Sequence, residues 1–343
     1  MSNKINYKEP ILVTGANGEV GHGLIPALSE NKNLQVVAAD INQLDLALKS
    51  KVDKFYKGSV TDSDFILELF RKYKFNTIFH LAAILSTGGE KDPDKAQFIN
   101  TQGIANILCI ANRVARDEKR TIKFVFPSTI AVYGIPSLNE KYKAGKITED
   151  QYNNPKTMYG INKLYCEMLG NYYSQNYKML EKRPVYRFID FRCLRFPGII
   201  SALTIPSGGT SDYIPEMIHA AAQGKGYKSF VRPDTQIPFM VMPDAIKALI
   251  LLSNAPKETL KNSVYNINSF SVKAEEIARI VNGVFPDSLI TYKPDENRQK
   301  IVDSWPMDID DSRAREDWGW CPDYDIKKAF ENYLVPQIKN LYK

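Results

Sequence analysis

Short apolar runs alternate with amphipathic stretches along the first half of the chain. Such a run predicts a buried strand, and apolar positions three or four residues apart predict a helix. Strands that alternate with helices pair in parallel, so the pattern predicts an α/β fold with a doubly wound parallel sheet. The predicted strands are residues 10–14, 34–39, 52–57, 77–81 and 122–126, and the predicted helices include 65–70 and 93–116.

The second half of the chain departs from this alternation. Residues 133–157 are polar and rich in Asn, Lys and Pro, which predicts a loop. We expect one domain over residues 9–195 and a smaller region over 196–335, with some segments of this region returning to the first domain. The elements predicted here are a strand over 186–195, helices over 213–222 and 244–252, and an extended segment over 236–242.

Composition and charge exclude several classes of protein. Of the 343 residues, 44% are hydrophobic and 24% are charged, which is ordinary for a globular protein. The net charge of +6 is modest and no Lys/Arg block stands out, so no nucleic-acid partner is expected. No apolar run approaches the roughly 18 residues that span a membrane, and no secretory signal is visible, so no membrane association is expected.

Cysteine and histidine positions give no sign of a metal site. The four cysteines are scattered without a Cys-x-x-Cys pair, and the three histidines form no pair with ligand spacing. No metal is therefore expected. Scattered cysteines also fit a reducing, cytoplasmic location.

A glycine-rich turn follows the first predicted strand. Gly15, Gly18 and Gly21 have the spacing that lets a pyrophosphate approach a helix N-terminus, although an ordinary tight turn uses the same residues. Asp40 ends the next strand, where a carboxylate accepts the hydroxyls of an adenosine ribose and repels a 2′-phosphate. In this context the motif predicts a Rossmann-like domain over residues 9–195 that binds NAD.

The chain has four Tyr-x-x-x-Lys pairs, each a candidate for an acid/base pair. On a helix this spacing places the lysine beside the tyrosine, where its charge favours the phenolate. Context favours Tyr159 and Lys163, which begin an amphipathic helix after the strand-end hydroxyls of Ser128 and Thr129. The other pairs are disfavoured for different reasons. Tyr142/Lys146 lies in a stretch with the composition of a loop, a proline interrupts Tyr152/Lys156, and no strand-end hydroxyls precede Tyr324/Lys328.

These motifs, with His80-Leu81-Ala82-Ala83, resemble the extended short-chain dehydrogenase/reductase family. The resemblance implies that Tyr159 is the acid/base and that Lys163 binds the nicotinamide ribose and lowers the pKa of Tyr159. It also implies that Ser128 and Thr129 position the substrate oxygen. The third strand departs from the family, because relatives place an aspartate near the adenine where this chain has Gly58-Ser59-Val60. The implied NAD-binding residues are Gly15, Asn17, Gly18, Glu19, Val20, Gly21, Asp40, Ile41, Ser59, Val60, Leu81, Ala82, Ala83, Asn100, Tyr159, Lys163, Pro197 and Ile199.

Segments of the second half resemble one group within this family, the short-chain-type L-threonine 3-dehydrogenases. The resemblance implies NAD-dependent oxidation of L-threonine to 2-amino-3-oxobutanoate, with Tyr159 as the general base. It also implies a homodimer that forms through the helices near 93–116 and 157–177. The segments that carry the resemblance are 195–201, 208–213, 233–240, 303–308 and 317–320. The expected substrate contacts are Ser86, Thr129, Tyr159, Thr210, Ser211 and Trp305, of which Ser86, Thr210 and Ser211 are neutral donors suited to a small zwitterion.

Two other functions stay open. A nucleotide-sugar epimerase or dehydratase would use the same acid/base pair on a larger substrate, and Lys225, Lys228 and Arg232 can supply cations for its phosphates. A non-catalytic NAD-sensing scaffold is disfavoured because the Ser, Thr, Tyr and Lys set is intact. The segment 133–157 is several residues longer than the resemblance implies. This extra length can shift the substrate preference.

Overall fold

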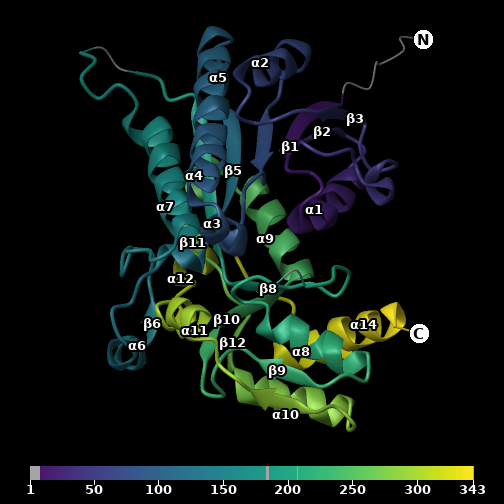
Figure 1. Ribbon diagram of the computed structural model, residues 1–343. Helices are drawn as coiled ribbons and strands as arrows, with labels where there is room; N and C mark the ends of the chain where they lie inside the picture. Colours follow the sequence, from purple (N-terminus) through teal and green to yellow (C-terminus); the bar gives the residue numbers. More distant parts are fainter. Residues whose placement is uncertain (1–7, 183–184, 207, 343) are drawn as a thin grey trace.

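A computed structural model describes residues 8–182, 185–206 and 208–342. Its centre is a seven-stranded sheet in which every neighbouring pair of strands is parallel (Figure 1). Helices cover both faces of this sheet, so the predicted α/β, Rossmann-like fold is confirmed. In spatial order the strands are β11 (Val264–Asn266), β7 (Ile189–Phe196), β5 (Ile122–Thr129), β4 (Thr77–His80), β1 (Glu9–Thr14), β2 (Leu34–Asp40) and β3 (Lys54–Lys57).

Two hydrophobic layers lie on the two faces of the sheet. Side chains alternate along a strand, so Ile11 and Val13 of β1 pack on one face and Leu12 packs on the other. Burial on both faces explains why β1 reads as a continuous apolar run. The first face is covered by α1 (Glu19–Ser29), α9 (Met242–Asn254) and α12 (Ser312–Trp318), and the second by α2 (Ser63–Lys72), α5 (Gly103–Asp117) and α7 (Met158–Asn171).

Most predicted elements differ from the observed ones by up to three residues at an end, as does the strand predicted over 186–195, which begins only at Ile189. The helix predicted over 93–116 is divided into α4 (Pro93–Gln97), a π-helical turn (Phe98–Gln102) and α5. The strand predicted over 52–57 begins only at Lys54, and it forms one edge of the sheet. None of these differences changes the order of the strands.

The segment 133–157, predicted to be a loop, contains regular structure, so this prediction was wrong. Ser137 caps a helix there, since its Oγ accepts a hydrogen bond from the Glu140 backbone N–H at 3.2 Å. Polar composition concealed this helix, whose buried residue is a lysine, Lys141. The two elements of the segment are α6 (Leu138–Ala144) and β6 (Lys146–Ile147).

A second layer packs against the carboxyl ends of the central strands (Figure 1). Its hydrophobic core reaches from Ile130, just after β5, to Ile338 near the end of the chain. The position of a domain boundary at residue 196 stays a prediction. The elements of this layer are β8 (Gly198–Ile200), α8 (Tyr213–Ala222), β9 (Tyr227–Ser229), β10 (Gln236–Val241), β12 (Phe270–Lys273), α10 (Ala274–Val284), β13 (Ile290–Tyr292), α11 (Glu296–Asp303), β14 (Asp308–Ile309), α13 (Ile326–Lys328) and α14 (Val335–Leu341).

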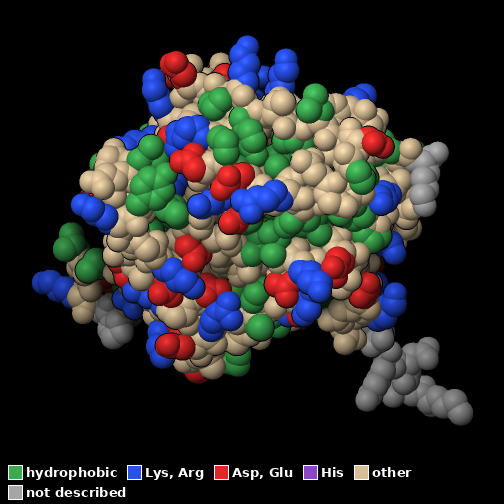
Figure 2. All heavy atoms as spheres, turned by 90° about the horizontal axis from the view of Figure 1, so that it is seen from below, with side chains coloured by type: hydrophobic (Ala, Val, Ile, Leu, Met, Phe, Trp, Pro, Cys, Tyr) green, Lys and Arg blue, Asp and Glu red, His purple; other side chains and the backbone are tan. Residues whose placement is uncertain are grey.

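Charges of both signs are mixed on the molecular surface. Figure 2 shows Lys and Arg side chains interspersed with Asp and Glu on the face seen from below. That face offers no broad basic patch of the kind that binds nucleic acid. Among the residues that the structure describes, no helix is both long and apolar enough to cross a bilayer.

Candidate active site

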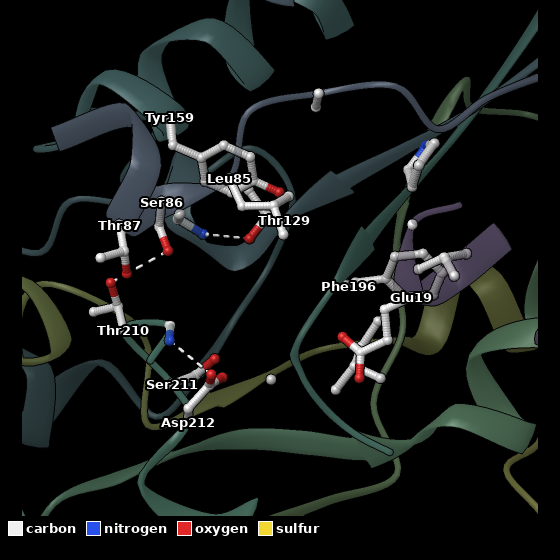
Figure 3. Close-up of a pocket in the computed structure, with 18 of the residues that line it drawn as sticks. Glu19, Leu85, Ser86, Thr87, Thr129, Tyr159, Phe196, Thr210, Ser211 and Asp212 are labelled. Carbon is white, nitrogen blue, oxygen red and sulfur yellow. Dashed lines mark hydrogen bonds between the residues drawn. The ribbon is translucent and has the colours of Figure 1, made fainter. Parts of the chain in front are cut away.

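A cavity of about 540 Å³ lies where the carboxyl ends of the central strands meet the second layer. Ligands bind at this position in open parallel sheets. Figure 3 shows Tyr159 and Thr129 on one wall, with Glu19 on the opposite side. The predicted site residues that line the cavity are Gly18, Glu19, Val20, Gly21, Leu81, Ala83, Ser86, Ser128, Thr129, Tyr159, Lys163, Pro197, Ile199, Thr210, Ser211 and Trp305.

Tyr159 and Lys163 lie on the first turns of α7. Thr157 caps this helix, since its Oγ1 accepts a hydrogen bond from the Gly160 backbone N–H at 3.1 Å. The Lys163 ammonium donates to the Pro127 carbonyl at 2.7 Å and lies 5.7 Å from the centroid of the Tyr159 ring. The cation is therefore fixed beside the phenol, where it favours the phenolate.

The other Tyr-x-x-x-Lys pairs do not lie within one helix. Tyr142 is on α6 whereas Lys146 is on β6, Tyr152 has a positive φ of 49°, and Tyr324 precedes α13. Of the four pairs, all in the described part of the chain, only Tyr159 and Lys163 lie on one helix, and their role as an acid/base pair stays a prediction. The reason given against Tyr142 was wrong, however, because that residue lies on a helix and not in a loop.

Burial shifts the pKa values of both Tyr159 and Lys163. It raises the pKa of Tyr159, and it lowers the pKa of Lys163 to about 8. Burial therefore opposes the phenolate form of Tyr159.

Ser128 and Thr129 have different hydrogen-bond partners. The Ser128 hydroxyl donates to the Glu167 carboxylate, which also pairs with the buried Arg195 guanidinium at 2.7 Å. Thr129 Oγ1 accepts from the Ala131 backbone N–H at 3.2 Å, and its own proton has no acceptor among the described residues. Thr129 therefore has a donor available to a ligand, whereas the Ser128 proton is engaged.

The glycine turn packs closely against the loop that follows β4. Gly15 has a φ of +71°, and a Cβ at this position would lie 2.5 Å from the Ala82 backbone nitrogen. Ala82 therefore lies behind the turn and not in the cavity. Residues 18–21 at the start of α1 line the cavity, and the backbone N–H groups of residues 19–21, which have no partner among the described residues, are available to a pyrophosphate. These features fit a dinucleotide such as NAD.

Five predicted cofactor residues lie outside the cavity, near the carboxyl ends of β2 and β3. Asp40 is 9% exposed, and one of its carboxylate oxygens accepts a hydrogen bond from the Asn17 backbone N–H at 3.0 Å. This bond places the carboxylate directly beside the glycine turn. Ile41 is exposed, Ser59 bonds to the hydroxyl two residues further on, and Val60 is buried.

Asn100 does not line the cavity. Its side-chain oxygen accepts from the Ile84 backbone N–H at 2.8 Å, and its amide group donates to the Ile84 carbonyl at 3.0 Å and to Asn162 at 3.2 Å. Asn100 thus anchors the loop after β4, which contributes Leu81 and Ala83 to the wall of the cavity.

Hydroxyl groups from two distant segments meet at the end of the cavity opposite the glycine turn (Figure 3). Thr210 donates to Ser86 at 3.3 Å, and Thr87 donates to the Gly208 carbonyl at 2.9 Å. Trp305, which is 4% exposed, also lines the cavity. The arrangement offers neutral donors and an apolar wall to a small polar molecule.

Sequence reasoning missed several polar residues of this site, including Lys91, Ser201 and Thr204 in the lining of the cavity. Thr87 and Asp212 line the cavity beside Ser86 and Ser211, which were predicted. Glu167 and Arg195 lie behind the wall, where they hold Ser128. The sequence contains a usable signal only for Glu167. It lies four residues after Lys163, so both side chains lie on the same face of α7.

Comparisons with known families and proteins agree with this geometry. Residues 11–268 match the NAD dependent epimerase/dehydratase family. The chain is 34% identical over 334 residues to the mitochondrial L-threonine 3-dehydrogenase of Bos taurus, covering 95% of this chain and 82% of that protein. It is 36% identical over 337 residues to an uncharacterised epimerase/dehydratase of Staphylococcus saprophyticus, covering 97% of this chain and 98% of that protein. A solved structure of a monomeric L-threonine 3-dehydrogenase from a metagenome is similar with a TM-score of 0.84 and 36% identity, covering 97% of this chain and 100% of that chain.

Proposed function

Because the chain belongs to the NAD-dependent epimerase/dehydratase family, we propose that it oxidises L-threonine at Cβ to 2-amino-3-oxobutanoate. The family and the relatives make the protein an NAD-dependent oxidoreductase that acts on a CH–OH group. The observation that carries the choice of substrate is the hydroxyl-lined end of the cavity, which places Ser86 and Thr210 opposite the glycine turn.

The proposed reaction assigns a separate task to each polar residue. Tyr159, as the phenolate, accepts the proton of the substrate hydroxyl while the hydrogen on Cβ leaves as hydride. Thr129 donates its available proton to the substrate oxygen and so orients it. Lys163 holds a positive charge beside the phenolate. NAD supplies the hydride acceptor when bound, and the products are 2-amino-3-oxobutanoate, NADH and a proton.

The cavity offers few cations to the phosphates of a nucleotide sugar. Arg232 pairs with Asp303 at 2.8 Å, and neither Lys225 nor Lys228 lines the cavity. Among the described lining residues the cations are Lys91 and Lys163, and Lys163 is held by a carbonyl. Two phosphates of a nucleotide sugar would therefore find few partners, which favours a small amino-acid substrate.

The direct test measures NADH formation by the purified protein with NAD and L-threonine, compared with L-serine, L-allo-threonine, 3-hydroxybutyrate and UDP-glucose. We expect the highest kcat/KM with L-threonine. Tyr159→Phe should lower kcat by about 1,000-fold while NAD still binds, because the proton acceptor is lost. Tyr165→Phe, which changes an exposed tyrosine of the same helix, is the matched control. Absence of NADH with L-threonine at saturating NAD contradicts the proposal, and turnover of UDP-glucose would support the alternative.

We also propose that two copies of the chain associate through α7. Large apolar side chains on this helix are exposed at positions 161, 165 and 168, among them Met168 at 66%. An exposed apolar stripe at helical spacing is typical of a helix that packs against a partner. One solved relative is described as monomeric, so similarity does not decide the oligomeric state. The cytoplasmic location stays a prediction.

A further inference from the structure

Lys141, a residue of α6, is almost completely buried. Its side chain is 3% exposed, and its ammonium donates to the Val302 carbonyl at 3.0 Å. A buried cation normally pairs with a carboxylate. Here the two carboxylates that act on it, Asp303 and Asp234, are paired with Arg232 instead. The proposed reaction gives this lysine no task, so its position needs another explanation.

The partner of Lys141 lies at the C-terminal end of α11 (Figure 1). Carbonyls in the last turn of a helix lack partners within the helix, and the helix dipole favours a cation there. The Val302 carbonyl also accepts the Trp305 backbone N–H at 3.1 Å. Lys141 therefore binds the same carbonyl that fixes the backbone of Trp305, a residue that lines the cavity.

A second contact from the same segment holds the backbone next to Trp305. The Ile135 backbone N–H donates to the Ser304 carbonyl at 2.8 Å. Ile135 and Trp305 are both buried in one hydrophobic cluster. Residues 135–141 thus bind the chain at Val302 and at Ser304, close to the tryptophan.

The N-terminal half of α11 reaches another wall of the cavity. Arg298 donates to the Gly208 carbonyl at 3.1 Å, and its guanidinium lies 4.4 Å from the centroid of the Phe230 ring. The Gly208 carbonyl also accepts from Thr87, which lines the cavity. The position of α11 therefore affects both Trp305 and the loop that carries Thr210.

We propose that α6 braces the substrate end of the cavity and that Lys141 is a positioning residue, which fixes α11 and through it Trp305 and the loop 208–212. This proposal rests on the proposed function only in taking this end of the cavity as the substrate site. It gives the lengthened segment 133–157 a role in substrate binding that involves no contact with the substrate.

The test compares Lys141→Met with Lys143→Met, which makes the same change at an exposed lysine on the same helix. Lys141→Met should raise the KM for L-threonine about 10-fold, because the hydrogen bond of a charged group is lost, with kcat and the KM for NAD changed less than about twofold. The melting temperature of Lys141→Met should not fall. Burial disfavours the Lys141 ammonium and lowers its pKa to about 8, and methionine removes the cost of burying this charge. Lys143→Met should match the wild type.

Hydrogen–deuterium exchange without substrate tests the brace independently of the reaction. In Lys141→Met the amides of Ile135 and Trp305 should exchange about 10-fold faster, whereas Lys143→Met should leave them unchanged. Arg298→Met, a partly exposed site outside the cavity, should likewise raise the KM for L-threonine and speed exchange over 208–212. Equal exchange in Lys141→Met and Lys143→Met overturns the proposal, as does faster exchange with an unchanged KM. A wild-type protein that does not oxidise L-threonine refutes the proposed function alone, because the exchange result still decides whether the brace exists.

Discussion

The adjacent hydroxyls of Ser128 and Thr129 differ in what they can donate, and this difference is testable. Thr129→Val removes the donor available to the substrate oxygen and should lower kcat/KM by about 100-fold. Ser128→Ala removes a donor to Glu167, so it should lower the free energy of unfolding by about 1–3 kcal/mol and kcat/KM by less than about 10-fold. Steady-state kinetics and urea unfolding separate the two effects. Equal kinetic losses in the two variants would contradict the division of tasks.

His80 makes the protein sensitive to acid. Its ring is buried, bonds to the Thr14 hydroxyl at 2.8 Å, and has a pKa that burial lowers from 6.5 to about 3. Between these values the unfolded chain binds a proton that the folded protein does not, so the free energy of unfolding falls as the pH drops below 6.5. At pH 5 this loss amounts to about 2 kcal/mol.

Urea unfolding at pH 7.5 and pH 5 measures this loss. His80→Gln has no titrating ring at this position, so its loss between the two pH values should be smaller than that of the wild type by about 2 kcal/mol. His22→Gln, at a partly exposed histidine, should keep the wild-type loss. An identical loss in the wild type and His80→Gln would remove His80 as the cause.

The start of α7 depends on a close contact that only glycine permits. A Cβ on Gly160 would lie 2.1 Å from the Ala131 carbonyl oxygen, a backbone atom that cannot move aside alone. Gly160→Ala should therefore displace the helix turn that carries Tyr159, lowering the free energy of unfolding by about 1–3 kcal/mol and kcat/KM by at least about 10-fold.

Gly283→Ala is the matched control for this substitution. Gly283 lies on α10, and no atom lies within 4 Å of where its Cβ would be. Alanine there should raise the free energy of unfolding by about 0.5–1 kcal/mol, because it restricts the unfolded chain and strain is absent. Thermal unfolding and kinetics of both variants check the prediction. A Gly160→Ala protein with wild-type stability would show that α7 can shift without cost.

Strands and helices were predictable where neighbouring residues form a recognisable sequence pattern. The strands β1 and β5 are long, buried apolar runs, and the glycine turn before α1 has a fixed spacing. The helix α6 has no such pattern, because its buried position is occupied by a lysine that a distant carbonyl accepts. A rule that reads lysine as exposed must fail at such a residue.

The exposed apolar stripe of α7 carries a prediction for the whole molecule. Met168→Glu would place a charge in the proposed contact between two copies and should convert a dimer to a monomer. Met179→Glu, at a methionine that is 75% exposed and lies outside α7, is the matched control and should leave the mass unchanged. Light scattering after size-exclusion chromatography measures the mass of each variant. A wild-type protein with the mass of one chain would refute the proposed dimer.

The sequence by itself determined the α/β class and predicted both the NAD-binding turn and the pair Tyr159 and Lys163, because each is marked by periodicity or by a fixed spacing along the chain. Only the tertiary structure decided which hydroxyl has a hydrogen-bond donor free for a ligand and what supports the substrate end of the cavity. Ser128 and Glu167 are 39 residues apart, and Lys141 and Val302 are 161 residues apart. Contacts at such separations depend on how all the elements pack together, and no periodicity or spacing along one element encodes that packing.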